Sequence, residues 1–257
     1  MLAKILKFPV LKRVIPSILI RTLRLLKKNR GYFKVKGTVM YLDFLDPIDR
    51  EIILHQQFEK LEVDFLIKVI QEHQINYFID VGANCGYYSM QIANEINKIT
   101  ILSFEPNPEA YLKFSKTLEK NISLSKKIIL KNYGLSNKSS KLKMQSLVKF
   151  GYPQTGGSSV IDGNQLHEHF VFLAKFENGD EKIKINNEKI AIKIDVEGYE
   201  INVLNGIKKI LQNNKCILQI EIFNKNYDKV SDFLLKFGYQ QFFEVKQRSN
   251  FFFKNFS

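Results

Sequence analysis

Residues 77–89 read YFIDVGANCGYYS, and this stretch decides the fold. The apolar run before Asp80 is typical of a parallel strand that is buried on both faces of a sheet. Gly82 and Gly86 then permit backbone angles and close contacts that a Cβ atom would prevent, so the pattern predicts a turn into a helix. A ligand in such a turn would meet amide groups at the helix start. A tight connection without a ligand is the alternative.

A second apolar run, residues 99–104, ends in Glu105, about 20 residues after Gly86. In doubly wound folds an acidic side chain at this distance binds the ribose hydroxyls of a nucleotide, because neighbouring strand ends bring it beside the glycine turn. A solvated carboxylate at a strand end is the alternative. The Pro-Asn-Pro sequence at 106–108 then predicts a turn into a helix that begins near Glu109 and ends near Asn121.

The glycine pattern distinguishes two cofactors. A dinucleotide site uses G-x-G-x-x-G, in which three glycines pack against a pyrophosphate. Residues 82–86 read G-A-N-C-G instead, and Asn84 suits the amino-carboxylate of S-adenosylmethionine better than a diphosphate. We expect Asp80 to hold the ammonium group of this cofactor, directly or through water. The alternative role for Asp80 is a helix cap or a turn former.

A third block, residues 190–200, reads IAIKIDVEGYE and predicts another buried strand with acidic residues at its carboxyl end. Ligands bind outside the carboxyl ends of strands in open α/β sheets, so Asp195 and Glu197 should face the same cavity as Gly82 and Glu105. Lys193, Asp195 and Glu197 share one side if the strand continues that far. A structural Lys193–Asp195 ion pair and a catalytic role explain these residues equally well.

These blocks, together with Asn132-Tyr133-Gly134-Leu135-Ser136, resemble the FkbM-type S-adenosylmethionine-dependent methyltransferases. The resemblance implies an α/β, Rossmann-like class I fold with a mostly parallel seven-stranded sheet, one antiparallel strand and helices on both faces. It also implies O-methylation of a hydroxyl, as on a sugar of a surface glycan or glycolipid precursor. Two positions depart from the family pattern: Gly134 replaces an expected alanine, and the segment before Lys193 is charged and rich in asparagine where relatives often carry Leu-Asp-Asp.

The resemblance and the strand-end positions together define the expected site. The expected catalytic residues are Lys193, Asp195 and Glu197, and no metal ligands are expected. The acceptor is expected to be a small molecule or a glycan. The residues expected to bind the cofactor are Asp80, Gly82, Asn84, Gly86, Glu105, Pro106, Asn107, Asn132 and Gly134.

Further acidic and histidine side chains are candidate general bases: Asp195, Glu197, Glu221, His167 and His169. Asp195 and Glu197 rank first by position, and Glu221 at the end of a strand alternatively orients Lys193. The two histidines lack a third zinc ligand nearby and suit a solvated loop. A divalent ion on Asp195 and Glu197 is a less favoured alternative.

Composition favours one domain in residues 37–257, with an insert at about 135–189 that selects the acceptor. Cys85 and Cys216 predict neither a disulfide framework nor a metal cluster, which favours a reducing cytoplasm. Helical spacing over 58–70 predicts a helix that covers the first strand. The remaining expected elements are strands at 128–133 and 216–222, a helix at 228–237 and a hairpin of strands at 240–245 and 251–254.

The net charge of +13 does not indicate a nucleic-acid enzyme. Residues 1–36 hold eleven basic and no acidic residues, and subtracting these eleven charges leaves +2 for the rest. A nucleic-acid enzyme would carry basic and aromatic residues around its cleft. The base-methylating motif Asp/Asn-Pro-Pro-aromatic is also replaced by Asp-Val-Glu-Gly at 195–198. We therefore expect no nucleic-acid partner.

The basic segment, residues 1–36, predicts a basic amphipathic helix over 17–28. Such helices lie on anionic membrane surfaces, here the inner face of the membrane of a cytoplasmic protein. Packing on the enzyme body or binding a partner protein are the alternatives. Its apolar runs fall short of the about 20 residues needed to span a bilayer, and no cleavage site follows, so neither an anchor nor a signal peptide is expected.

Two other functional classes remain open on the sequence alone. One is a nucleotide-sugar or dinucleotide oxidoreductase, which would use the glycine turn for a nicotinamide cofactor. The other is a non-catalytic module that docks on a membrane through residues 1–36. The oligomeric state cannot be predicted from the residues.

Overall fold

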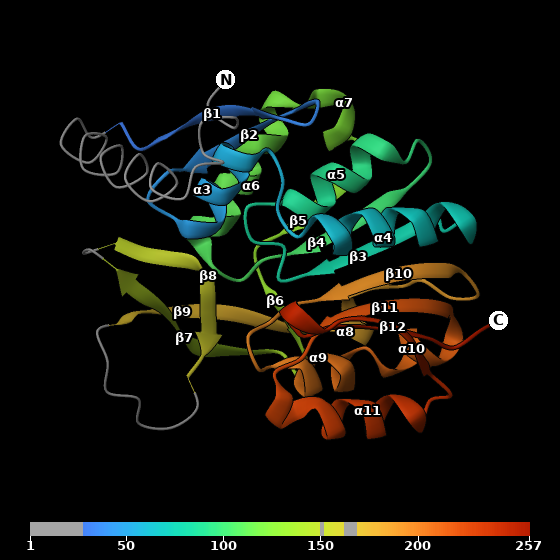
Figure 1. The fold of residues 1–257 in the computed structure, drawn as a ribbon. Helices are drawn as coiled ribbons and strands as arrows, with labels where there is room; N and C mark the ends of the chain where they lie inside the picture. Colours follow the sequence, from blue (N-terminus) through green and yellow to red (C-terminus); the bar gives the residue numbers. More distant parts are fainter. Residues whose placement is uncertain (1–27, 150–151, 162–168) are drawn as a thin grey trace.

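The computed structural model describes residues 28–149, 152–161 and 169–257, and Figure 1 shows their arrangement. Most of the predicted helix at 17–28, and His167, lie outside these residues. Within the described part of the chain, no helix combines the length and apolar character needed to cross a bilayer.

A seven-stranded sheet forms the centre of the molecule, in the order β12-β13-β11-β10-β3-β4-β5. Its strand β13 runs antiparallel to both β11 and β12, whereas the other neighbouring pairs are parallel. The predicted sheet of seven strands with one antiparallel member is therefore confirmed. The strands are β3 (Tyr77–Val81), β4 (Thr100–Phe104), β5 (Ile128–Lys131), β10 (Lys189–Ile194), β11 (Lys215–Glu221), β12 (Gln240–Val245) and β13 (Asn250–Lys254).

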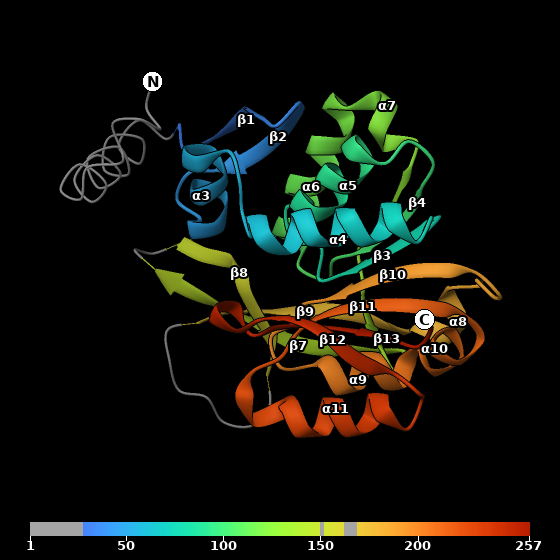
Figure 2. The same ribbon diagram turned by 45° about the vertical axis from the view of Figure 1, so that its right-hand side comes forward.

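Helices cover both faces of this sheet (Figures 1 and 2). One face carries α4 (Lys60–Glu72), α5 (Tyr87–Glu95), α6 (Pro108–Lys120) and the short α7 (Ile122–Ser125); the other carries α9 (Glu200–Gly206), α10 (Lys208–Asn213) and α11 (Tyr227–Leu235). Helix α6 begins where expected, because Pro108 occupies its first turn and the Asn107 side chain accepts hydrogen bonds from the amides of Glu109 and Ala110.

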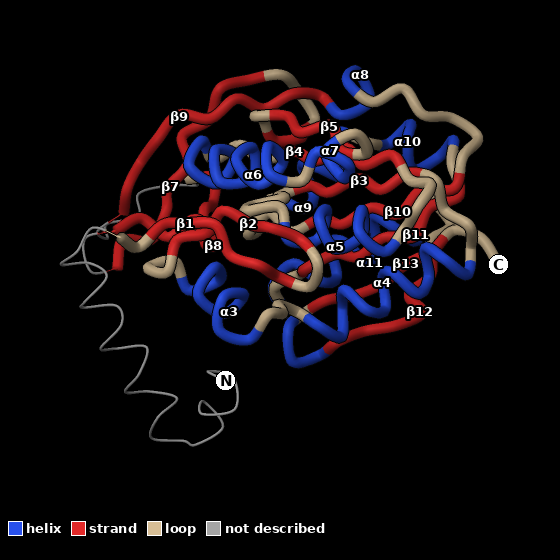
Figure 3. The backbone as a smooth tube through the Cα atoms, turned by 90° about the horizontal axis from the view of Figure 1, so that it is seen from above, coloured by secondary structure: helices blue, strands red, loops and turns tan. Residues whose placement is uncertain are grey.

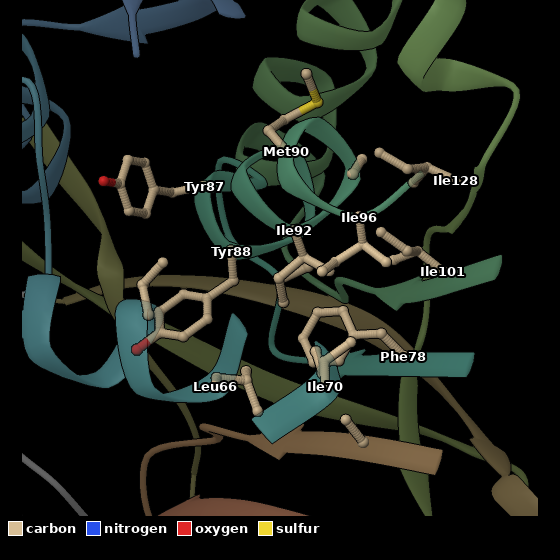
Figure 4. Close-up of a cluster of buried hydrophobic side chains, with 14 of the residues drawn as sticks. Leu66, Ile70, Phe78, Tyr87, Tyr88, Met90, Ile92, Ile96, Ile101 and Ile128 are labelled. Atoms are coloured by element: carbon tan, nitrogen blue, oxygen red, sulfur yellow. The ribbon is translucent and has the colours of Figure 1, made fainter. Parts of the chain in front are cut away.

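Alternating strand residues supply a separate core on each face. Phe78 lies with Leu66 and Ile70 of α4 and Ile92 of α5 (Figure 4), whereas its neighbour Ile79 belongs to the cluster on the α9–α11 face. The period of two residues along a strand therefore explains why β3 is apolar throughout. Both cysteines are buried free thiols, Cys85 in the core on the α4 and α5 side and Cys216 in the core on the α9–α11 side.

A smaller four-stranded sheet, in the order β6-β9-β7-β8, is built from the segment that was expected to be an insert; we call it the small sheet. Seen from above in Figure 3, β7 and β9 extend to one side of the main sheet, near the hairpin of β1 and β2. The small sheet comprises β6 (Gly134–Ser136), β7 (Ser140–Lys149), β8 (Tyr152–Val160) and β9 (His169–Asn178), and α8 (Gly179–Lys182) leads to β10. The hairpin is β1 (Arg30–Val35) and β2 (Thr38–Asp43), followed by α3 (Pro47–His55).

The ends of β10 and β5 differ from the prediction in ways that affect the site. Strand β10 ends at Ile194, so Asp195 and Glu197 follow the strand instead of extending it. The backbone turns there, because Glu197 and Gly198 have φ angles of 52° and 100°. Strand β5 ends at Lys131, two residues early, where the Asn132 side chain donates a 2.9 Å hydrogen bond to the carbonyl of Glu105.

Candidate active site

The glycine turn after β3 packs against the end of β10. Gly82 has a φ of 83°, and a Cβ atom built there would lie 1.9 Å from the carbonyl oxygen of Asp195. Gly86, also at φ 83°, caps α5, and its Cβ would lie 2.3 Å from the ring of Phe114. Both positions therefore require glycine, which brings the turn into contact with the strand end that carries the acidic residues.

The amides of this turn are used within the protein. Those of Gly82 and Ala83 donate to the carbonyl of Phe104, at 3.0 and 3.1 Å. The amide of Asn84 donates to Oε2 of Glu105 at 2.7 Å. The sequence suggested that amides of this turn face a ligand, but these three are bonded within the protein. They hold the end of β4 and Glu105 against the turn.

Glu105 is held at both carboxylate oxygens. Its Oε1 accepts a 2.7 Å hydrogen bond from the amide of Asn107, and its Oε2 accepts the bond from Asn84. Burial raises the pKa of Glu105 to about 7, although the two amides oppose this shift. Because a carboxylate offers about four acceptor positions, Glu105 keeps capacity for ligand hydroxyls while its orientation is fixed.

A pocket of about 840 Å³, which includes space open to solvent, lies at the carboxyl ends of β3, β4 and β10. Its position is where open α/β sheets bind ligands. The expected residues that line it are Gly82, Asn84, Glu105, Pro106, Gly134, Lys193, Asp195 and Glu197. The expected residues that do not line it are Asp80, Gly86, Asn107 and Asn132, and the last two instead support Glu105 through the hydrogen bonds described above.

Asp80 lies below the pocket, on the sheet face covered by α5. Its carboxylate accepts a 2.6 Å hydrogen bond from the hydroxyl of Ser89, and its sheet register places it opposite Lys193. Asp80 is therefore not the helix cap considered as an alternative, since Gly86 holds that position. Burial raises the pKa of Asp80, and the positive charge of Lys193 opposes the shift. Direct contact with a ligand in the pocket would require Asp80 to move.

Lys193 and Asp195 form a partly buried ion pair at 2.8 Å, with the Lys193 side chain buried and that of Asp195 reaching the pocket. Burial alone would lower the pKa of Lys193, but the charges of Asp195, Asp80 and Glu59 raise it overall. The ammonium group also lies 4.7 Å from the ring centre of Tyr88. Lys193 is thus a permanent cation that fixes Asp195 at the pocket wall.

Glu221 interacts mainly with Asp195, and the charge of Lys193 acts on it more weakly. The two carboxyl groups share a hydrogen bond. Burial and the negative charge of Asp195 raise the pKa of Glu221, so Glu221 holds the proton and donates it. Asp195 lies between two donors, and Lys193 helps to keep its pKa low despite burial.

Glu197 also lines the pocket but has a different environment. Among the described residues, none donates a hydrogen bond to its carboxylate or forms an ion pair with it. Burial, aided by the charges of Asp195 and Glu200, raises the pKa of Glu197 to about 7. Glu197 is therefore available to accept a proton near neutral pH. In the described ranges, no three or more His, Cys, Asp or Glu side chains are grouped as metal ligands.

A buried polar network beside the pocket was not predicted. The hydroxyl of Thr155 in β8 lies 2.8 Å from Asp46 Oδ2, 3.1 Å from Asn84 Oδ1 and 2.9 Å from Lys113 Nζ. Lys113 also pairs with Asp49 at 2.6 Å. This network joins the small sheet to α3, α6 and the glycine turn. The sequence carries one indication of this network, because helical spacing puts Lys113 on the buried face of α6 with Ala110, Phe114 and Thr117.

We expect Thr155→Val to lower the free energy of unfolding by about 1–2 kcal/mol, because the isosteric side chain leaves buried polar partners unsatisfied. Urea unfolding measures the change. Thr100→Val, at an exposed position in β4, is the matched control and should change stability by less than about 0.5 kcal/mol. Equal stability of the two variants would show that the network does not join these elements.

Gly134 departs from the family pattern for a reason visible in the packing. A Cβ atom there would lie 2.5 Å from the ring of Phe176 in β9, and both residues line the pocket. We expect Gly134→Ala to lower the free energy of unfolding by about 1–3 kcal/mol, the cost of overpacking. Phe176→Leu in the same chain should restore part of this loss.

Thermal and urea unfolding of the single and double variants test this coupling. Gly31→Ala is the control, because its Cβ would meet only the ring of Phe33, at an ordinary 3.8 Å. Additive losses in the double variant would contradict the account of Gly134.

The sheet order with its antiparallel β13, and the pocket at the carboxyl ends of β3, β4 and β10, define a class I S-adenosylmethionine-dependent methyltransferase. The methyltransferase FkbM domain model matches residues 80–241. The chain belongs to the FkbM methyltransferase family, as its motifs suggested. This assignment removes the oxidoreductase as an alternative.

Individual relatives agree with this assignment. Methyltransferase sdnD of Sordaria araneosa is 25% identical over 62% of this chain and 74% of its own length. Hexuronic acid methyltransferase AglP of Haloferax volcanii is 28% identical over 55% of this chain and 54% of its own. The crystal structure of methyltransferase FkbM from Methylobacillus flagellatus KT has a TM-score of 0.51 at 17% identity, over 70% of this chain and 43% of that chain. This last likeness concerns the fold.

Proposed function

We propose that the protein transfers the methyl group of S-adenosylmethionine to a hydroxyl of a sugar, in a surface glycan or glycolipid precursor. The observation that carries this proposal is one pocket lined by Glu105, the glycine turn and Glu197. It places a carboxylate suited to a ribose beside a carboxylate suited to a proton transfer. The name of the relative AglP, a hexuronic acid methyltransferase, supports a glycan as the acceptor class.

The residues of the pocket fit S-adenosylmethionine. Glu105 would accept the ribose hydroxyls, and the apolar wall of Leu135 and Phe176 beside Gly134 would cover the adenine. Asn84 would face the amino-carboxylate group. Glu105, Asp195 and Glu197 outnumber Lys193 in the lining, so the pocket favours a cationic ligand. When bound, the cofactor supplies an electrophilic methyl group on a sulfonium.

Glu197 is the proposed general base. An acceptor hydroxyl must lose its proton as it is methylated, and Glu197 has no competing hydrogen bond among the described residues. Asp195 is less suited, because Lys193 and Glu221 already donate to it. Lys193 and Asp195 would instead position the chain at the end of β10, and with it Glu197.

A labelled-methyl assay tests the function. The protein is incubated with labelled S-adenosylmethionine and with glycolipid and polysaccharide fractions, and mass spectrometry identifies the product. We expect label in a sugar methyl ether, which survives mild alkali. Label released by mild alkali would indicate a methyl ester on a carboxyl group, and label in no fraction would contradict a glycan acceptor.

A further inference from the structure

A second cavity, also of about 840 Å³ with its open part included, lies beside the first. It is bounded by the β1–β2 hairpin, the start of α6 and the small sheet. Thr155 of β8 lines both cavities. The second cavity is also lined by Arg30, Glu109, Ser146, Tyr152 and Phe170. No step of the proposed methyl transfer uses this space.

The inner face of the small sheet runs from one cavity to the other. In β9, Phe176 lines the first cavity and Phe170 lines the second, and the even spacing puts both on one face with Phe172. In β7, likewise, Met144 lines the first cavity and Ser146 lines the second. At about 3.3 Å per residue, the stretch from Phe170 to Phe176 covers about 20 Å, the length of several linked sugar units.

Hydroxyl and amide groups lie along the boundary between the two cavities. The hydroxyls of Ser146 and Ser158 are 2.7 Å apart, and the side-chain amide of Asn107 donates to Ser158 at 2.8 Å. Asn107 and Ser146 are buried, and Thr155 continues the polar line. The bonds above satisfy the buried Asn107 and Ser146, so the half-buried hydroxyls of Ser158 and Thr155 are the ones placed to meet a sugar chain that passes between the cavities.

The charges of the second cavity favour an uncharged ligand. Arg30 pairs with Asp43 at 2.7 Å and with Glu109 at 3.1 Å, so its guanidinium is committed. Lys113 pairs with Asp49 in the network described above. The lining acids outnumber the lining bases by one, which disfavours a phosphate or a carboxylate. Tyr152 and Phe170 offer ring faces for the apolar side of a sugar.

We propose that the second cavity binds a further, uncharged sugar unit of the acceptor. The acceptor is then an oligosaccharide that lies along the inner face of the small sheet, with the methylated unit in the first cavity. This inference rests on the proposed function for the identity of the reacting unit. It adds that the enzyme selects a chain of at least two sugars.

A binding experiment without turnover tests the cavity directly. Saturation-transfer NMR is recorded on the full chain with S-adenosylhomocysteine and a mixture of maltose, cellobiose and lactose, with glucose as the single-unit reference. We expect transfer to at least one disaccharide, and its loss in Tyr152→Ala and in Phe170→Ala. Val171→Ala is the matched control, since Val171 is 51% exposed and points to the opposite face of β9. Transfer to no disaccharide, or equal transfer in all variants, would overturn the inference.

A kinetic experiment separates the failure of this inference from failure of the proposed function. Oligosaccharides and monosaccharides are prepared from the fraction that accepts label. We expect kcat/KM to be about tenfold higher for the two-unit acceptor, and Phe170→Ala to remove this preference without changing donor affinity. Methylation with equal kcat/KM for both lengths would overturn the second site alone. Disaccharide binding with no methylation of any glycan would overturn the proposed function alone.

Discussion

Glu105→Ala is expected to weaken binding of S-adenosylmethionine at least about 100-fold, or about 2.7 kcal/mol. The variant loses the carboxylate proposed to accept the ribose hydroxyls, and charge-assisted hydrogen bonds of this kind contribute about 1.5–3 kcal/mol each. It also frees the amides of Asn84 and Asn107, which Glu105 holds at 2.7 Å. Isothermal titration calorimetry at pH 8 measures the dissociation constant.

The pH dependence of donor binding follows from the same group. The pKa of Glu105 is raised to about 7, and only the ionised carboxylate can accept from both the ligand and the two amides. Donor affinity should therefore fall as the pH is lowered through about 7 in the wild type, and this step should be absent in Glu105→Ala. Glu95→Ala removes an exposed carboxylate of α5 and is the control. Unchanged donor affinity in Glu105→Ala would show that the ribose binds elsewhere.

Glu197→Gln is expected to lower kcat by about 10²–10⁴-fold, the range for loss of a general base. The amide keeps the size of the side chain but cannot accept the proton of the acceptor hydroxyl. Donor affinity should fall much less than kcat, because Glu105 and the glycine turn are unchanged and Glu197 contributes only part of the negative charge of the pocket. Steady-state kinetics with saturating donor, together with calorimetry, separate these two effects.

The pH profile identifies the ionising group. The pKa of Glu197 is raised to about 7, so kcat of the wild type should rise with pH and level off above about 7 as the carboxylate ionises. Glu197→Gln should lack this rise. Glu181→Gln, at an exposed position of α8, is the control and should behave as the wild type. A wild-type kcat in Glu197→Gln would show that another residue acts as the general base.

The sequence best predicted the site residues that lie at or just after the carboxyl ends of strands. Glu105 and Asp195 come directly after apolar runs and Glu197 follows two residues later, and parallel strands bring such positions to one edge of the sheet. Their placement around one pocket was therefore predictable. The tail hairpin was predictable too, since two apolar runs flank a short polar turn, and its strands β12 and β13 lie where expected.

Side-chain partners were less predictable than strand ends. Asp80 was expected to hold the cofactor's ammonium group directly or through water, but the sequence did not indicate that it would lie on the α5 face of β3 opposite Lys193 of β10. Strand alternation gives the face, whereas the register between two strands that are far apart in the sequence sets the partner. Thr155 and Asp46 are 109 residues apart and meet only because the small sheet folds back over the turn. No local pattern encodes that contact.

The position of the bound donor is central to the proposed function, and a crystal structure of the complex with S-adenosylhomocysteine tests it directly. We expect the adenosine in the pocket at the ends of β3, β4 and β10, with its ribose hydroxyls on Glu105 and its sulfur on the side of Glu197. Density for the ligand outside this pocket, or a ribose without contact to Glu105, would contradict it.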